Sequence, residues 1–568
     1  MSSLFRYSIY ILAFFVVNSL VHGDDNAPQR GFQCSALANL DLVDTTITLV
    51  ELLPKGNFLA PDGASFILPS FCRVTAIAKT SSQSDIGFEV WLPSSNWNGR
   101  YHQYDIGGVR DHISYPSFAW RLSKGDVIAQ VDTIGTWDED ESNKRALQED
   151  SFAAFRDAEK VFDLTRGHRV AAKRAKAITK AYYQKPPHHS YFTGCSGGGY
   201  SALLEAQRNP EAWDGILAGA PANYILQLLL GTYAWTGQQW ENEAGRIPPE
   251  KLPLIQKTAL SFCTEDAHVV DGVATDPRFC RYDPAVLLCQ GEDRNDCLTA
   301  EQVKTLENIY QGPRLGTGEQ IYPGFPAGME AEISPAWGGS WMLGTTGGVV
   351  NNKAEIPRSY NVFKKVYRNF ISEGSAWSAE SFSFDRDYPR AFNKRLLGQS
   401  LNSILNADSP DLSSFQAKGG RLLIYHGWGD ENQPPQGGID YYKNVSKYMG
   451  GHHKTQEFMR LFMVPGFMHC VGGPGANAFG QYGNEKYSKA LKDDSEHDIV
   501  RALEAWVEKG RVPEQIIAAK YIRDKPELGV KFTRPLCPYP SIAIYQGKGD
   551  VNSTDNFRCK VHRKGLSE

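Results

Sequence analysis

The chain has 568 residues, of which 41% are hydrophobic and 22% charged, and this balance is typical of a globular protein and not of a disordered one. Its length allows one large domain with insertions, or two or three domains. The formal net charge of −4 gives no electrostatic reason to expect nucleic acid or an anionic membrane as a partner.

The N-terminal residues 1–23 have the pattern of a secretory signal peptide. Arg6 stands near the start, and a largely apolar run covers residues 9–21. This run is too short and too close to the N-terminus to predict a transmembrane helix, although a buried N-terminal helix is an alternative. We therefore expect a secreted, extracellular protein.

In the stretch 24–222, segments with strand character alternate with helical ones. Residues 87–93 and 126–132 are expected to be strands, and the apolar spacing in 160–183 predicts a long amphipathic helix. This alternation indicates an α/β fold with a mostly parallel sheet covered by helices on both faces. We assign residues 24–222 to the first part of a catalytic domain.

A candidate nucleophile follows the expected strand 189–194. Gly194-Cys195-Ser196-Gly197-Gly198 has G-x-S-x-G spacing and precedes a helical segment, which is the strand–turn–helix context of a nucleophile elbow. The residue after the nucleophile, Gly197, would donate one backbone N–H to the oxyanion. Gly107 and Gly108, in a loop after an earlier strand, are candidates for the second donor, unless they form only a tight turn.

The composition changes in residues 223–416, where no long alternation of strands and helices is found. This stretch holds many glycines and prolines, four cysteines and the tryptophans Trp235, Trp240, Trp337, Trp341 and Trp377. We interpret it as an inserted lid domain. Its tryptophans suit stacking on an aromatic acyl group, but tryptophan serves equally well in packing.

The alternation returns in residues 417–568, which we assign to the second part of the catalytic domain. An expected strand at 420–427 leads to Asp430, and another at 458–464 leads to His469. The order Ser, Asp, His along the chain is that of the α/β-hydrolase fold. His469 would take the proton of Ser196, and Asp430 would orient the imidazole.

Two neighbouring residues give alternatives to this assignment. Asp440 is a rival for the acid, although it sits in an expected helix start where a capping role is simpler. His426 lies beside the same loop and is expected to be structural.

Ten cysteines, an even number in an exported chain, predict five disulfides. No two have C-x-x-C spacing, so a zinc knuckle is not expected. Sequence alone does not fix the connectivity. Proximity along the chain suggests four local pairs and leaves one long-range pair that would bring Ser196 and His469 together: Cys34–Cys72, Cys263–Cys280, Cys289–Cys297, Cys537–Cys559 and Cys195–Cys470. Two N-glycosylation sequons, at Asn444 and Asn552, matter only if the host glycosylates.

With these motifs the chain resembles the tannase and feruloyl esterase family, secreted α/β hydrolases with a Cys-Ser, Asp, His-Cys pattern. The resemblance implies that Ser196, Asp430 and His469 are a catalytic triad, supports the disulfides above, and implies a lid domain that caps the site and carries most substrate contacts. The matching stretches extend from end to end of the catalytic domain: 98–100, 194–199, 214–222, 425–430, 464–470 and 534–540.

The sequence departs from the family pattern at an expected calcium site in the lid. Asp271 and the carbonyls of Val269 and Val273 match ligands of that site, but Thr264 and Ala267 replace two carboxylates. A hard cation needs six to eight oxygen ligands and compensating charge. Either the neighbouring acids at 265 and 266 substitute by a local shift, or this loop, stapled by a disulfide, no longer needs metal.

Two further departures, at 104–108 and 132–136, are expected near the mouth of the site, so we expect an unusual substrate choice. The sequence predicts a serine carboxylic ester hydrolase that acts on aromatic-acid esters, feruloyl esters first, either small or linked to plant polymers. No cofactor is required for this chemistry. The alternatives are a tannase acting on gallate esters, a hydrolase of another aromatic ester such as a phthalate-type monoester, an acyltransferase to an alcohol, and a silent binding protein on the same fold.

Overall fold

The computed structural model describes residues 33–108, 113–133, 151–333, 349–350, 353–354, 356–371, 377–481 and 488–561. The expected signal peptide at 1–23, most of the departure at 132–136, and Trp337 and Trp341 lie outside the described residues. Within the described part, no helix combines the length and the apolar character needed to cross a bilayer.

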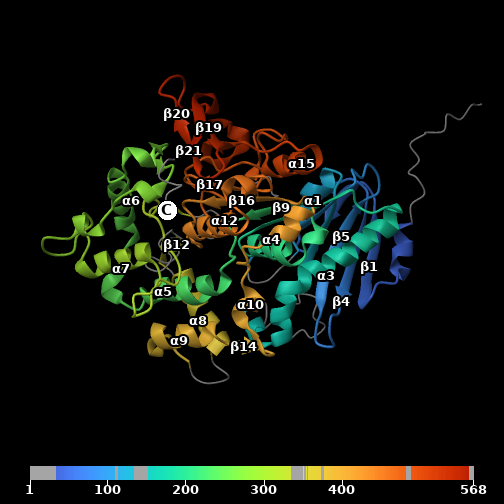
Figure 1. Ribbon diagram of the computed structural model, residues 1–568, viewed down its shortest axis with the longest axis horizontal. Coiled ribbons are helices and arrows are strands. Elements are labelled where there is room, and N and C mark those ends of the chain that lie inside the picture. The colour runs from blue at the N-terminus through green and yellow to red at the C-terminus, as the bar shows by residue number, and fades with distance from the viewer. Residues whose placement is uncertain are drawn as a thin grey trace, which may run out of the picture.

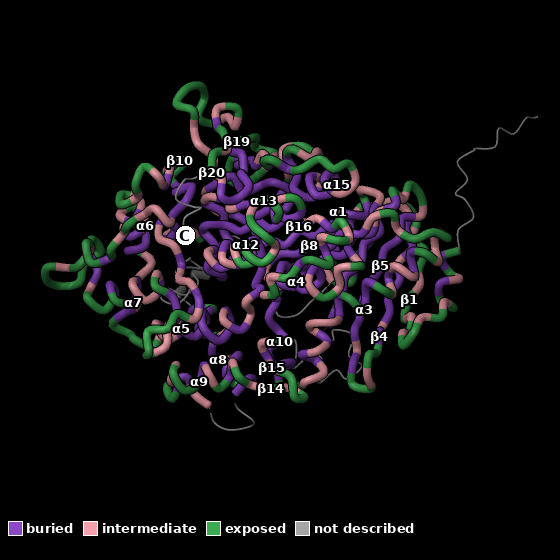
Figure 2. Tube along the Cα trace, in the orientation of Figure 1, coloured by how far each residue is buried: buried purple, intermediate pink, exposed green. Residues whose placement is uncertain are grey.

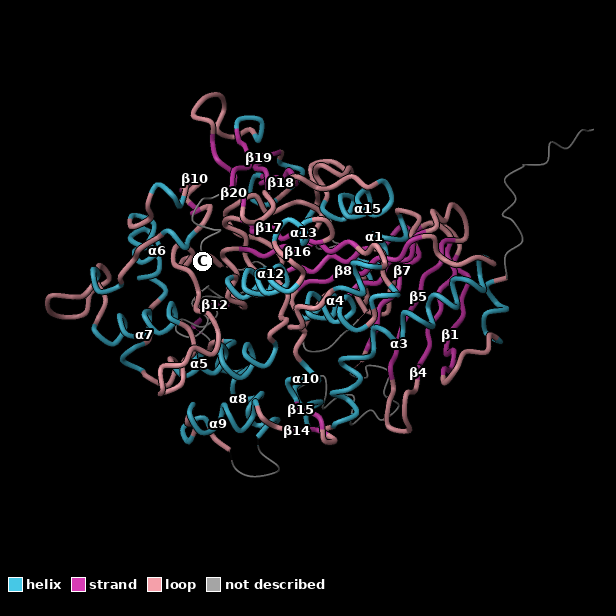
Figure 3. The backbone as a smooth tube through the Cα atoms, viewed as in Figure 1, coloured by secondary structure: helices cyan, strands magenta, loops and turns pink. Residues whose placement is uncertain are grey.

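A nine-stranded sheet forms the centre of the molecule (Figure 1). Figure 3 shows its strands in magenta, with helices on both sides. The strand order is β1-β4-β5-β7-β6-β8-β9-β16-β17. The strands are β1 Thr45–Leu53, β4 Phe71–Ala78, β5 Ile86–Pro93, β6 Arg100–Asp105, β7 Val127–Asp132, β8 His189–Cys195, β9 Gly215–Gly219, β16 Arg421–Gly427 and β17 Met459–Val464.

The strands from β7 through β6, β8, β9 and β16 to β17 are parallel, and they carry the site. Asp105 pairs with Gly194, and Cys195 pairs with Gly219. Because parallel strands end at the same edge, the loops after β6, β8 and β16 meet there. Ligands bind at this edge in open α/β sheets.

The other side of the sheet, β1, β4, β5 and β7, is antiparallel. The expected strands at 87–93 and 126–132 are present as β5 and β7, but β5 pairs antiparallel with β7. The sheet is therefore mixed. β1 forms its edge, and most of the strand is partly or fully exposed.

Alternate strand residues point to opposite faces of the sheet, so both faces carry apolar side chains. Helices cover both faces and bury these side chains. On β8, Tyr191 belongs to the core cluster beneath α15 (Ile499–Lys509), whereas Phe192 belongs to the larger cluster beneath α3 (Ala158–Tyr183) and α4 (Gly197–Arg208). Figure 2 shows the buried sheet enclosed between these layers. The helix α1 (Tyr115–Ser123) lies on the same face as α15, and Arg121 of α1 contacts Glu504 of α15 at 3.2 Å.

Between β9 and β16, no described residue joins the main sheet. Helices and small two-stranded hairpins fill this stretch and gather at one side of the molecule (Figure 1). Phe363 and Tyr367 lie in the same continuous core as the sheet residues, so the insertion and the sheet are packed together. Apart from short 3₁₀ turns, its described elements are η4 Gln227–Thr232, α5 Tyr233–Gln238, α6 Leu252–Ser261, β10 Val269–Val270, β11 Val273–Ala274, α7 Ala300–Gln311, β12 Val349–Val350, β13 Lys353–Ala354, α8 Arg358–Ile371, α9 Phe384–Phe392, β14 Arg395–Leu396, β15 Gln399–Ser400, α10 Leu401–Leu405 and α11 Ser413–Ala417.

After β16 come α12 (Gln436–Tyr448) and α13 (His452–Gln456), and after α15 come two hairpins. β18 (Ile516–Tyr521) pairs with β19 (Val530–Leu536), and β20 (Ser541–Tyr545) pairs with β21 (Phe557–Val561). All five expected cysteine pairs are bonded in the structure.

Candidate active site

Ser196 occupies a sharp turn between β8 and α4, with φ of 65°. A non-glycine residue in the left-handed region is uncommon and marks a strained turn, as a nucleophile elbow requires. The flanking glycines make the turn fit. A Cβ on Gly194 would lie 2.3 Å from the Gly198 carbonyl oxygen, and one on Gly198 would lie 2.0 Å from the Asp105 carbonyl oxygen.

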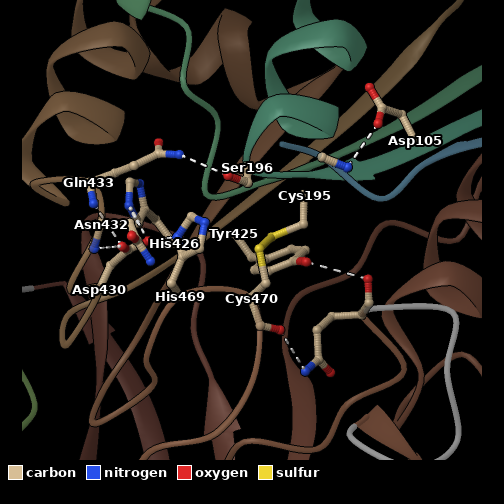
Figure 4. The surroundings of a disulfide bond; sticks show 12 residues. Asp105, Cys195, Ser196, Tyr425, His426, Asp430, Asn432, Gln433, His469 and Cys470 are labelled. Carbon is tan, nitrogen blue, oxygen red and sulfur yellow. Dashed lines mark hydrogen bonds and ion pairs between the residues drawn. A yellow bond between two sulfur atoms is a disulfide. The ribbon is translucent and has the colours of Figure 1, made fainter. Parts of the chain in front are cut away.

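The disulfide Cys195–Cys470 joins this turn to the loop after β17, across a separation of 275 residues (Figure 4). The two Cα atoms lie 6.0 Å apart. Since Ser196 and His469 each neighbour one of these cysteines, the bond places the hydroxyl and the imidazole at the same edge of the sheet.

Asp430 lies fully buried in the loop after β16. Its Oδ2 is 2.8 Å from Nδ1 of His469. The backbone N–H groups of Asn432 and Gln433 donate to its Oδ1 at 2.9 and 2.8 Å. Figure 4 shows the His469 ring between this carboxylate and Ser196. The structure thus brings together the three residues expected from sequence.

Burial alone would raise the pKa of Asp430, but the charge of His469 and hydrogen bonds from His426 and His469 outweigh it and lower that pKa below its ordinary value. Asp430 therefore stays ionised, as the orienting acid must. Asp440, the rival acid, lies on α12 and accepts a hydrogen bond from Gln436 Nε2 at 2.8 Å. Burial raises the pKa of Asp440.

Three residues around the triad play parts that the sequence did not reveal. His426 Nε2 lies 3.2 Å from the same Asp430 oxygen that binds His469, so His426 directly contacts the acid of the triad. Glu431 accepts the backbone N–H of His469 at 2.9 Å. Gln433 donates from Nε2 to Ser196 Oγ at 3.4 Å. No motif marks them, although Glu431 directly follows Asp430 in the chain and Gln433 comes two residues later.

The glycine loop after β6 packs against the elbow, as expected. A Cβ on Gly107 would lie 3.1 Å from Ser196 Cβ and 3.2 Å from the Gly197 nitrogen. However, the Gly107 N–H donates to Asp105 Oδ1 at 2.8 Å. It is therefore engaged and does not suit the oxyanion role expected of it. Gly197 and Gly108 remain the candidate donors, and the Gly108 N–H has no hydrogen bond to the described residues.

Comparison with protein families gives a match to the model described as tannase and feruloyl esterase over residues 72–560. The chain belongs to the tannase and feruloyl esterase family. It is a carboxylic ester hydrolase, as its esterase relatives indicate.

Three relatives illustrate the breadth of the similarity. An uncharacterized esterase of Xanthomonas campestris pv. campestris is 39% identical to this chain, covering 94% of the chain and 92% of the relative. A probable feruloyl esterase of Arthroderma benhamiae is 30% identical, with coverages of 83% and 82%. The mono(2-hydroxyethyl) terephthalate hydrolase of Piscinibacter sakaiensis is 30% identical, with coverages of 93% and 91%.

Among solved structures, an esterase from Aspergillus oryzae matches the esterase with a TM-score of 0.77 at 26% identity, covering 93% of this chain and 99% of the other. Feruloyl esterase B from the same organism matches with a TM-score of 0.77 at 24% identity and the same coverages. These matches show that the esterase has the fold of the two enzymes, an α/β-hydrolase architecture.

The residues expected to hold calcium do not fit that ion in this chain. Asp271 is the single matching carboxylate, and its Oδ1 accepts a hydrogen bond from Arg534 Nη2 at 2.7 Å. Thr264 uses its hydroxyl to bond the Phe279 carbonyl at 3.2 Å. Val269 and Val273 lie in the short β10–β11 hairpin, and Val269 is 44% exposed. A guanidinium stands at the carboxylate where a cation would bind.

Elsewhere among the described residues, His102, Asp126 and Glu504 form the one cluster with metal-ligand spacing. Arg121 Nη1 lies 3.2 Å from both acids, so a guanidinium already supplies the positive charge there. The two sequon asparagines, Asn444 and Asn552, are exposed, and their glycosylation stays a prediction.

Proposed function

We propose that this esterase hydrolyses esters of aromatic carboxylic acids, hydroxycinnamoyl (feruloyl) esters first, through a Ser196 acyl-enzyme. The observation that carries the proposal is the buried Asp430–His469 pair, with 2.8 Å between Oδ2 and Nδ1, held beside Ser196 by the Cys195–Cys470 bond. The aromatic acyl group is inferred from a relative named as a probable feruloyl esterase.

In the acylation step, His469 Nε2 takes the hydroxyl proton as Ser196 Oγ forms a bond to the ester carbonyl carbon. The carbonyl oxygen becomes an oxyanion, which the N–H groups of Gly197 and Gly108 would stabilise. The C–O bond to the alcohol then breaks, and the leaving oxygen takes the proton from His469. Ionised Asp430 stabilises the imidazolium between these two transfers.

In the deacylation step, water replaces the alcohol. His469 takes a proton from the water as its oxygen bonds to the acyl carbon, and the oxyanion forms again in the same place. The bond to Ser196 Oγ breaks, Oγ recovers a proton from His469, and the aromatic acid leaves. An alcohol that replaced water here would make the enzyme an acyltransferase, and products formed with added alcohol test that variant.

A terephthalate monoester is the second candidate substrate, because a relative that covers 93% of this chain is named for that activity. Gallate esters, the tannase alternative, are the third candidate. All three substrates are esters of planar aromatic acids, so the same chemical steps serve each of them.

We further propose that the protein is secreted. Five disulfides and no free cysteine among the described residues suit an oxidising compartment. Detection of the mature protein in culture medium, with Edman sequencing of its N-terminus, tests this part.

The test of the activity uses the purified protein and Ser196→Ala with methyl ferulate, methyl caffeate, methyl gallate, chlorogenate and mono(2-hydroxyethyl) terephthalate, and measures the acid released. We expect release that depends on Ser196, with the highest kcat/KM for a hydroxycinnamate. Release that is equal in the alanine variant would overturn the mechanism. A higher kcat/KM for gallate or terephthalate would change the substrate assignment.

A further inference from the structure

Asp105 is the last residue of β6, and it lies behind the nucleophile elbow, 4% exposed. Its Oδ1 accepts the Gly107 N–H at 2.8 Å, which closes a turn over two residues. The neighbouring strand places Gly194 opposite Asp105, two residues before Ser196. Figure 4 shows this side chain directed at the glycine loop on the side of Ser196 away from His469.

The other oxygen of this carboxylate is held by a helix on the covering layer. His168 of α3 places Nε2 3.2 Å from Asp105 Oδ2. Gln103 Nε2 lies 3.1 Å from His168 Nδ1, and the Tyr101 hydroxyl donates to Gln103 Oε1 at 2.7 Å. The tyrosine fixes the amide, whose nitrogen faces Nδ1, so Nε2 is the ring nitrogen that faces Asp105.

The turn closed by Asp105 determines where the glycine loop touches the elbow. A Cβ on Gly107 would lie 2.3 Å from the Cys195 carbonyl oxygen, and one on Gly197 would lie 2.1 Å from the Gly108 carbonyl oxygen. The loop and the elbow are therefore in contact at two successive glycines. A small change in the turn would move the Gly108 N–H relative to Ser196.

We propose that Asp105, anchored by His168, is a positioning residue that holds the Gly107–Gly108 turn so that Gly108, and not Gly107, donates to the oxyanion. The inference rests on the proposed function, because it assumes an oxyanion formed at Ser196. Asp105 does not touch substrate. It acts through the backbone of Gly107.

The Asp105 carboxylate could act through its negative charge or through its hydrogen bond to Gly107. These two roles predict different activities for a variant that removes only the charge. Burial alone would raise the pKa of Asp105, but the hydrogen bond and charge of His168 and the bonds from Gly107 and Ser201 lower it. A negative charge so close to an oxyanion does not itself help catalysis. An asparagine keeps an oxygen for the Gly107 N–H and removes the charge, so it should preserve the function.

The test compares Asp105→Ala and Asp105→Asn with wild type, using the best substrate found above. Oxyanion donors act in the transition state, and removing one lowers kcat by about 10²–10³-fold. Because the donor is displaced and not removed, we expect Asp105→Ala to lower kcat by about 10–100-fold with KM within about twofold. The same variant should lose affinity for an aryl boronic acid, which forms a tetrahedral adduct, while ferulate binding is unchanged. Asp105→Asn should stay within about threefold of wild type.

Asp163→Ala is the matched control, since Asp163 is also a buried aspartate, on α3, and it accepts hydrogen bonds from Ser84 and from Arg166 of the same helix. His168→Phe should lower kcat in the same direction as Asp105→Ala and by a smaller factor, and it replaces Asp105→Ala if that variant does not fold. Equal losses in Asp105→Ala and Asp163→Ala, or equal losses in the alanine and asparagine variants, would overturn the inference. Failure of the proposed function appears separately, as wild-type activity that does not depend on Ser196.

Discussion

Two joins hold distant parts of this esterase together, and they use different chemistry. Cys195–Cys470 links the elbow after β8 to the loop after β17 by a covalent bond beside Ser196 and His469. Asp271–Arg534 links the β10–β11 hairpin of the insertion to β19 by an ion pair, with side-chain exposures of 16% and 10%. The join beside the reacting atoms is thus covalent, whereas the join between the hairpin and β19 is ionic and adds to a shared hydrophobic core.

The largest expected effect lies inside the covalently joined site. Asp430→Asn should lower kcat by about 10⁴-fold, because the amide no longer favours the imidazole tautomer or stabilises the imidazolium. Steady-state kinetics on the best substrate measure this change. Asp440→Asn, at a partly buried acid on nearby α12, is the control and should remain within about twofold. Comparable losses in both variants would mean that Asp430 is not the orienting acid.

The next effect tests the covalent join itself. The double variant Cys195→Ser, Cys470→Ser should lower kcat by about 10–100-fold, since a misplacement of about 1 Å is costly in a preorganised site. It should also lower the free energy of unfolding by about 2–4 kcal/mol. Removing Cys537–Cys559 in the same way should lower stability but leave kcat near wild type. If both double variants changed kcat alike, the covalent join would have no special role at the site.

The ionic join should affect stability and not chemistry. Asp271→Asn leaves Arg534 without its carboxylate between the rings of Phe532 and Phe557, at 4.7 and 4.4 Å. We expect the free energy of unfolding to fall by about 1–3 kcal/mol while kcat is retained. Thermal melts and hydrogen exchange at 269–274 measure this effect. A large fall in kcat would contradict the separation of the two joins.

The smallest expected effect is that of metal removal. Since a guanidinium already pairs with Asp271, chelation by EDTA followed by dialysis should leave the melting temperature and kcat unchanged. Adding Ca²⁺ back should change neither quantity. A melting temperature that fell with chelation and recovered specifically with Ca²⁺ would contradict this expectation. It would mean that the protein binds calcium in addition to the Asp271–Arg534 ion pair.

The parts of the site predictable from sequence are those with strict local chemistry. The turn at Ser196 needs glycines on both sides, and a strand and a helix with clear periodicity flank it. The G-x-S-x-G spacing was therefore sufficient to predict the nucleophile elbow. The long helix expected over 160–183 is also present, as α3 at Ala158–Tyr183, and it begins after an aspartate N-cap.

The parts that sequence could not predict depend on packing between distant segments. The antiparallel half of the sheet was not foreseen, because much of β1 is exposed and lacks a buried apolar pattern. The engagement of the Gly107 N–H depends on a side-chain rotamer of Asp105. The contact between Gln433 and Ser196 depends on how the loop after β16 wraps around Asp430. None of these contacts leaves a periodic signal in the chain.

The shared core of sheet and insertion constrains how the family can diversify. Phe363 and Tyr367 pack in one continuous interior with residues beneath α3 and α4. A homologue's insertion therefore cannot be grafted onto this scaffold as an independent module. A change of substrate preference between members must come from substitutions that preserve this shared core, or from replacing the core residues of the sheet and of the insertion together.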